Sequence, residues 1–248
     1  MKDLFQFNEP LKQPRFKPSV SLDHRSGIAA IKQSPSHSKD LILVSLFKDY
    51  NHLPLKALFA EAKRVLRHDG NLIIVGTEPV LSRFRIYGKK YYRHEYTYPI
   101  HKSLLEPHKK NGPVPSHVSV AVFQFSHDSF YRPMLSPRFP HKDPVISPHN
   151  PIWEPDYHGD WPTSTLYIYR FKEFEDERIY NPMVDLYRFL YETYSKPGSS
   201  ILSLSAISAE GVAAVKTARN YTGCIYHEHD YLIARQRLEW AKKHLHIH

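Results

Sequence analysis

The chain has 248 residues, a formal net charge of +9 at neutral pH and one cysteine, Cys224. Its length suits one large α/β domain with insertions, or two small ones. The single cysteine excludes an intramolecular disulfide, and no apolar run reaches the roughly 20 residues of a membrane span. The excess of Lys and Arg favours a polyanionic partner. We expect a cytoplasmic protein with no membrane partner, since the N-terminus lacks a secretory leader and the cysteine content suits a reducing compartment.

The first third of the chain shows an α/β pattern. Residues 1–20 contain three prolines among alternating charges and predict an irregular arm. An apolar run at 40–45 predicts a buried strand, and 53–66 has the apolar spacing of a helix. We expect Gly70 to end that helix with a positive φ, before a second buried strand at 71–76. Strand, helix and strand in this order form a βαβ unit, which implies a parallel sheet.

The composition changes between about residues 80 and 170. Residues 81–110 contain eight Lys or Arg and two acids, with interleaved aromatic residues. Ten of the 20 prolines lie in 111–170, around strand-like runs at 118–125 and 165–171. This much proline predicts an irregular insertion that lies on the surface of the domain.

The basic part of this insertion has two interpretations. Its tyrosines can pack on the domain while its lysines face water, or its cations can bind phosphates while tyrosines stack on bases. We favour the second. The candidate nucleic-acid-binding residues are Arg83, Arg85, Lys89, Lys90, Arg93, Lys102, Lys109 and Lys110.

The α/β pattern resumes near residue 183. A helix, a strand, a helix, a strand and a final helix are expected from 183 and at 201–205, 210–219, 222–226 and 229–245. Ser208 is the expected N-cap of the second helix. The final helix is expected to bury Leu232, Ile233, Leu238, Ala241 and Leu245. Histidines at alternate positions occur in or beside this helix, where such spacing does not gather ligands on one side, so we predict no metal site.

The order of these elements resembles that of the amino-methyltransferases that modify adenine N6 or cytosine N4 in DNA, in the group whose catalytic half precedes the cofactor half. The resemblance covers about residues 20–240. The segments that carry it are 38–44, Arg64-Val65-Leu66 with the following Gly turn and strand, 76–79 and 117–123. It implies one domain over 1–248 with a Rossmann-like, mostly parallel, doubly wound sheet. The insertion at about 80–170 would then correspond to the target-recognition region and lie across the carboxyl edge of the sheet.

The catalytic motif of that family, Asp-Pro-Pro-Tyr, corresponds to Ser45, Leu46, Phe47 and Lys48. The family motif presents a carbonyl and a polar side chain to the target amino group, and its aromatic ring stacks on the flipped base. Ser45 can still accept a hydrogen bond and Phe47 can still stack, but both prolines that shape the loop are missing. We interpret the motif as degenerate, with no catalytic residue.

The family's cofactor loop, Asp-Pro-Phe-x-Gly-Ser-Gly-Thr-Thr, uses its glycines to bring the backbone close to S-adenosylmethionine. Here Ser203 stands at the acid, and Ile207 and Ala209 stand at the glycines. The ribose-binding acid after the next strand is missing around Ile225, and the family's early Gly-Asp corresponds to Arg25-Ser26. The degenerate positions Ser26, Ser203, Ile207, Ala209 and Ile225 predict that no cofactor binds.

Three functional hypotheses remain open. The first is a catalytically inactive methyltransferase-like protein that binds DNA or a protein partner as a regulatory subunit, in a homodimer or in a heterodimer with an active methyltransferase. The second is a divergent active enzyme that transfers a methyl group from S-adenosylmethionine to DNA or RNA, using Ser45 and Phe47. The third is an inhibitor or scaffold directed at a protein.

Overall fold

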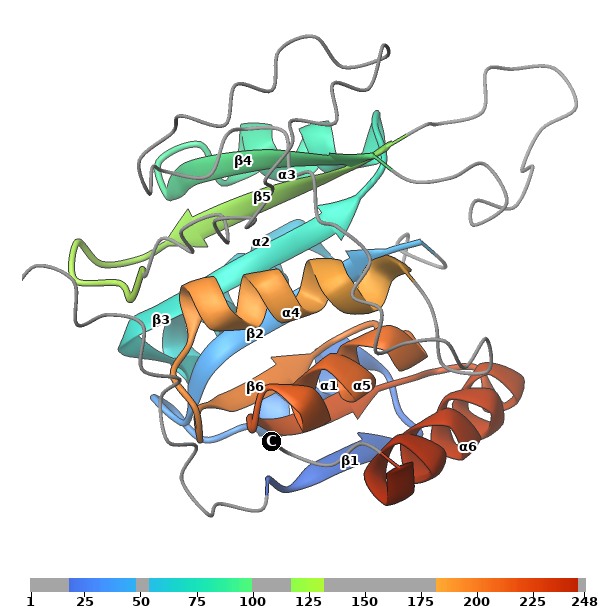
Figure 1. Cartoon of the computed structure of the whole chain (residues 1–248). Coiled ribbons are helices and arrows are strands. Elements are labelled where there is room, and N and C mark those ends of the chain that lie inside the picture. Colours follow the sequence, from blue (N-terminus) through green and yellow to red (C-terminus); the bar gives the residue numbers. More distant parts are fainter. Residues whose placement is uncertain (1–17, 48–53, 100–116, 132–181, 245–248) are drawn as a thin grey trace, which may run out of the picture.

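The computed structural model describes residues 18–47, 54–99, 117–131 and 182–244. Its centre is a seven-stranded sheet (Figure 1). In spatial order the strands are β1 (Val20–Asp23), β7 (Asn220–Cys224), β6 (Ser200–Ser203), β2 (Lys39–Leu46), β3 (Leu66–Gly76), β5 (His117–Gln124) and β4 (Tyr92–Pro99). The pairs from β1 to β3 are parallel, and β5 is antiparallel to both of its neighbours. The predicted mostly parallel α/β sheet is therefore confirmed.

Helices cover both faces of the sheet. They are α1 (Gly27–Gln33), α2 (Leu55–Val65), α3 (Val80–Tyr87), α4 (Pro182–Tyr194), α5 (Ser208–Lys216) and α6 (Glu228–His244). One buried cluster joins the sheet to α1, α2 and α3, and a second joins its other face to α4, α5 and α6 (Figure 1). This is the doubly wound arrangement that the sequence predicts. Among the described helices, none combines the length and apolar character required to cross a membrane.

Strand β2 shows how the sequence decides which face a side chain takes. Its residues alternate between the two clusters, because successive side chains of a strand point to opposite faces. Ile42 and Val44 pack toward α1 and α2, whereas Leu41 and Leu43 pack toward α4 and α5. The same alternation turns Ser45, near the carboxyl end of β2, toward α4 and α5, where its hydroxyl meets their side chains.

The junction between α2 and β3 differs from the sequence prediction. The helix ends at Val65, β3 begins at Leu66, and Gly70 lies inside the strand without a positive φ. The register of β2 and β3 shifts here, so that a short bulge contains Gly70. A Cβ at Gly70 would lie 3.0 Å from the carbonyl oxygen of Asp40. Close approach of two backbones, and not a left-handed helix cap, is therefore the reason for this glycine.

The insertion expected at about 80–170 is largely regular over its described residues 80–99 and 117–124. Residues 80–99 form α3 and β4, and β5 follows, so that two strands of the sheet come from this stretch. The expectation of an irregular excursion is wrong for these residues, because Tyr96 and Tyr98 of β4 are buried and pack in the core. The strand-like run at 165–171, the ten prolines of 111–170 and the first 17 residues of the arm lie outside the described residues.

The expected inner face of α6 is only partly correct. Ala234, Leu238 and Ala241 are buried, but Leu232 is 48% exposed and Ile233 is 37% exposed. Two alanines in the inner stripe let the helix approach the domain closely, and the larger side chains at 232 and 233 then point outward. The fifth expected residue, Leu245, lies outside the described residues.

Arg219 fixes the ends of two helices. Its side chain is buried and donates hydrogen bonds to the carbonyl oxygens of Tyr191 and Ser195 at the end of α4, at 3.2 and 2.8 Å. It also donates to the carbonyl oxygen of Thr217, which caps α5. A buried guanidinium is tolerated here because the carbonyl ends of two helices surround it with partial negative charge.

We expect Arg219→Met to lower the free energy of unfolding by about 2–4 kcal/mol, because it leaves several buried carbonyl groups without a donor. Urea denaturation followed by circular dichroism would measure the change. Arg235→Met, on the exposed side of α6, removes the same charge and serves as the control. A loss for Arg219→Met no larger than that of the control would contradict this role.

Candidate functional site

The candidate site lies at the carboxyl ends of β6 and β2, which are neighbours in the sheet. From β6 the chain continues through α5 to β7 on one side, and from β2 it continues through α2 to β3 on the other. In open α/β sheets, ligands bind in the crevice that this reversal of strand order creates. The residues at these two strand ends therefore decide whether a cofactor can enter.

Ser205, in the loop after β6, fastens that loop to β2. Its hydroxyl accepts a hydrogen bond from the backbone N–H of Ser45 at 3.1 Å and donates one to the carbonyl oxygen of Ser45 at 2.7 Å. The N–H of Leu204 also donates to the carbonyl oxygen of Leu43 at 2.9 Å. The two strands thus stay joined beyond the end of β6, across the position where the crevice would open.

Glu210, in the first turn of α5, ties the same two segments together with its side chain. Its Oε2 accepts a hydrogen bond from the N–H of Ile207 at 2.6 Å, and its Oε1 lies 2.5 Å from the hydroxyl oxygen of Ser45. That hydroxyl lies 2.8 Å from the hydroxyl oxygen of Tyr187 on α4. Glu210 is fully buried, and Ser45 is 1% exposed. We call Ser45, Tyr187, Ser205 and Glu210 the switch-point cluster.

Burial governs the charge state of this cluster. Removal from water raises the pKa of Glu210 to about 8, although hydrogen bonds from Ser45 and from the backbone of Ile207 act in the opposite direction. Burial therefore favours the neutral form of this carboxyl group, which accepts a hydrogen bond from Ser45. Burial also holds the pKa of the Tyr187 hydroxyl well above its usual value. The cluster is an uncharged hydrogen-bonded network in the core.

The three described residues of the predicted catalytic motif, Ser45, Leu46 and Phe47, have contacts in the core. Ser45 is occupied by the switch-point cluster, and Leu46 is buried on the opposite face of the sheet, toward α1 and α2. Phe47 is partly buried and packs against the α4 and α5 side. Lys48 lies outside the described residues.

The predicted cofactor positions fall into two groups. Ser203 and Ala209 are buried beside the switch-point cluster, and Ile207 packs against the core with an extended backbone at φ −111°. Ile207 also takes the N-cap position expected for Ser208, because the side chain of Glu210 caps its N–H.

The other two cofactor positions lie at the ends of β1 and β7. Ser26 caps α1, where its hydroxyl accepts a hydrogen bond from the N–H of Ala29 at 3.4 Å. Ile225 is buried, and its N–H donates to the carbonyl oxygen of Asp23 at 3.0 Å. Ser26 and Ile225 thus each make hydrogen bonds that stabilise the local backbone.

Sequence reasoning missed three of the four members of the switch-point cluster. Glu210 has one usable signal, since an acid at the third position of a helix often caps its N-terminus. That signal does not indicate burial or contact with β2. Tyr187 and Ser205 have no sequence signal, because their partners lie in distant segments of the chain.

The predicted nucleic-acid-binding residues differ in whether their charges are paired with acids of the protein or exposed. Arg85 forms ion pairs with Glu78 and Glu95, so acids of the protein already balance its charge. The exposed cations are Arg83, Lys89, Lys90 and Arg93. The remaining three, Lys102, Lys109 and Lys110, lie outside the described residues.

The turn between α3 and β4 lies at the amino edge of the sheet, away from Ser45. Tyr92, at the start of β4, pairs with Phe123 of β5, which itself pairs with Leu72 near the beginning of the paired part of β3. The end of β3, Gly76, pairs instead with Ser119. The expectation that this basic stretch lies across the carboxyl edge is therefore wrong for residues 89–93, because α3 carries the chain back along the sheet (Figure 1).

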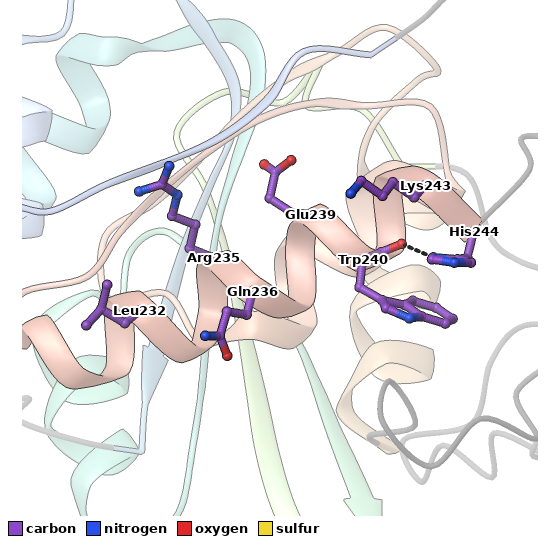
Figure 2. A pocket seen from close by; sticks show the side chains of 7 residues that line it. All are labelled: Leu232, Arg235, Gln236, Glu239, Trp240, Lys243 and His244. Atoms are coloured by element: carbon purple, nitrogen blue, oxygen red, sulfur yellow. Dashed lines mark hydrogen bonds between the residues drawn. The ribbon is translucent and has the colours of Figure 1, made fainter.

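A groove on the outer side of α6 is lined by Leu232, Arg235, Gln236, Glu239, Trp240, Lys243 and His244 (Figure 2). The rings of Trp240 and His244 stack with centroids 4.1 Å apart. Every lining residue comes from one helix, so the groove does not combine with the switch-point cluster. Within the described ranges, no group of three or more His, Cys, Asp or Glu is placed to hold a metal ion.

Comparison with solved structures identifies the fold as that of DNA methyltransferases. The M1.HpyAVI–SAM complex has a TM-score of 0.56 and 14% identity, covering 88% of this chain and 98% of that chain. The cytosine-N4-specific PvuII DNA methyltransferase has a TM-score of 0.61 and 13% identity, with coverages of 91% and 89%. A Thermus thermophilus protein assigned as a DNA modification methylase, in complex with S-adenosyl-L-methionine, has a TM-score of 0.57 and 14% identity, with coverages of 91% and 97%. No family model and no curated protein sequence matches the chain.

Titration of Glu210 should make stability depend on pH. The pKa of this group is about 8 when folded and near its usual 4.5 when unfolded. The folded state therefore binds the proton more tightly, and stability should fall as pH rises from about 4.5 to about 8, by at most about 1.4 kcal/mol per pH unit. Glu210→Gln keeps the size of the side chain and should remove this slope.

Urea denaturation across the pH range would measure this slope. Glu228→Gln, at the exposed start of α6, should leave the slope of the unmodified protein unchanged. A Glu210→Gln variant that retains the full slope would show that this carboxyl group does not titrate in that window.

Proposed function

We propose that this protein is a catalytically inactive, methyltransferase-like protein that binds nucleic acid, with DNA as the first candidate, and does not use S-adenosylmethionine. The fold supports the first part, since the similar solved structures include DNA methyltransferases. The switch-point cluster supports the second part. Its hydrogen bonds lie at the carboxyl ends of β2 and β6, the edge at which an open α/β sheet binds a ligand.

The observation that carries this proposal is the contact between Glu210 and Ser45. It joins the helix after the expected cofactor loop to the first residue of the expected catalytic motif at 2.5 Å, with both side chains buried. A cofactor in this crevice would have to break that contact and leave a carboxyl group without its partner. Separating a buried hydrogen-bonded pair costs about 1–3 kcal/mol for each unsatisfied group.

The active-enzyme hypothesis requires Ser45 to face a target base. The hydroxyl of Ser45 instead contacts Tyr187 and Glu210, and the neighbouring Leu46 points into the opposite core. Transfer would therefore need a rearrangement of the end of β2. For this reason we prefer the hypothesis of a catalytically inactive protein to that of an active enzyme.

Isothermal titration calorimetry with S-adenosylmethionine should give no binding heat up to millimolar cofactor, because we expect the switch-point cluster to exclude the cofactor from the crevice. M1.HpyAVI, whose complex with the cofactor is solved, is a suitable positive control. A micromolar dissociation constant would overturn the proposal and return attention to the active-enzyme hypothesis. Detection of methyl transfer to DNA or RNA, with loss of that transfer in Ser45→Ala, would also overturn the proposal.

The nucleic-acid part of the proposal rests on charge. The formal charge of the chain is +9, and the turn between α3 and β4 exposes Lys89, Lys90 and Arg93 close together in sequence. Exposed cations of this kind neutralise phosphates and release bound counterions. Because this turn lies at the amino edge of the sheet, the proposed contact with DNA does not require the closed crevice.

We expect the combined variant Lys89→Glu, Lys90→Glu and Arg93→Glu to weaken binding to a DNA duplex and to flatten its dependence on salt. The logarithmic salt slope should fall by roughly 0.9 for each phosphate that the variant no longer neutralises. Fluorescence anisotropy at several salt concentrations would measure both effects. The matched control reverses Arg235, Lys242 and Lys243, three exposed cations of α6, and equal losses in the two variants would reject a specific surface.

We also propose that the protein acts as a regulatory subunit, for which an active methyltransferase is one candidate partner. A subunit without methyltransferase activity is compatible with a role in positioning DNA for an active subunit. Co-elution with such an enzyme and a change in its activity on addition of this chain would support that role.

A further inference from the structure

The last turn of α3 exposes an apolar side chain among cations. Arg83, Ile86 and Tyr87 lie on α3 at i, i+3 and i+4, which places them on one side of the helix, and Lys90 follows in the turn after it. Ile86 is 77% exposed, more than any other large hydrophobic side chain among the described residues. Single exposed aliphatic residues are common on protein surfaces, but this one lies beside several exposed cations in the sequence.

The backbone segment that carries Ile86 is anchored by its neighbours, although the Ile86 side chain is exposed. Leu81 and Phe84 anchor the opposite side of α3 in the core. The ring of Tyr87 packs on Phe59 of α2 with centroids 5.4 Å apart. Gly88 then ends the helix against Phe59, where a Cβ would approach the ring to 2.5 Å. The backbone around Ile86 is thus fixed by contacts on both sides.

The charges around Ile86 indicate the kind of partner. Residues 79–94 contain five Lys or Arg and no acid. Arg85 is already paired with Glu78 and Glu95, and the other four cations are exposed. A surface with this balance, and with only one strongly exposed aliphatic residue, fits a polyanion better than an ordinary protein interface, whose centre is apolar and depleted of charge.

We propose that Ile86 is a wedge that inserts between base pairs of duplex DNA and kinks the duplex. DNA-bending proteins use Ile, Leu, Phe or Met in this way, with cations on the adjacent phosphates. In this protein Arg83, Lys89 and Lys90 would contact the phosphates on either side of the opened step. The inference rests on the proposed binding of DNA at this surface and adds the way in which the DNA is bound.

The test is a short DNA duplex with a fluorescence donor at one end and an acceptor at the other, together with an anisotropy measurement of affinity. The unmodified protein should raise energy transfer, as expected for a kink of roughly 20–90°. Ile86→Ala should still bind, with a dissociation constant raised by no more than about tenfold, but should leave the energy transfer of the free duplex unchanged. Leu232→Ala, at an exposed apolar position on α6, should bend DNA like the unmodified protein.

The outcomes separate this inference from the proposed function. Binding without bending by the unmodified protein, or equal bending by Ile86→Ala, overturns the wedge and leaves DNA binding intact. No binding of duplex DNA by the unmodified protein overturns both. Since Ile86 is exposed, its replacement should not change the urea midpoint, which checks that Ile86→Ala is folded.

Discussion

The contact between Glu210 and Ser45 is the interaction on which the candidate site depends. It crosses the line where the strand order of the sheet reverses, and it is supported from α4 by Tyr187 and from the loop by Ser205. A carboxyl group is stable in this position because it is mostly protonated at neutral pH and bonded at both oxygens. These contacts make the carboxyl ends of β2 and β6 part of the core.

The switch-point cluster and the exposed cations lie at opposite edges of the sheet. Ser45 is near the carboxyl end of β2, whereas Lys89 and Lys90 precede β4 at the amino edge. This separation follows from the direction of α3, which returns along the sheet as any crossover between parallel strands must. The proposed binding of DNA at one edge and the proposed closure of the crevice at the other can therefore be tested by different substitutions.

Much of the fold could be predicted from the sequence, because hydrophobic periodicity is a local property. The runs at 40–45 and 71–76 became β2 and β3, and the helix expected at 53–66 became α2. The failures share one cause, which is contact with distant residues. Gly70 serves an approach to Asp40, and Leu232 points outward because Ala234 and Ala241 bring α6 close to the domain. Of the candidate site, the sequence identified Ser45 and Ser203 but not Glu210 or Tyr187.

The sequence by itself determined the α/β pattern of 40–76 and 183–244 and the excess of positive charge, since each depends on residue type and local spacing. Only the tertiary structure decided that Glu210 meets Ser45, because 165 residues separate them and burial, not sequence, sets the pKa of the carboxyl group. It also decided that Arg85 pairs with Glu78 and Glu95 while Lys89 and Lys90 stay exposed. A basic residue contributes to a surface only if no acid reaches it in the folded chain.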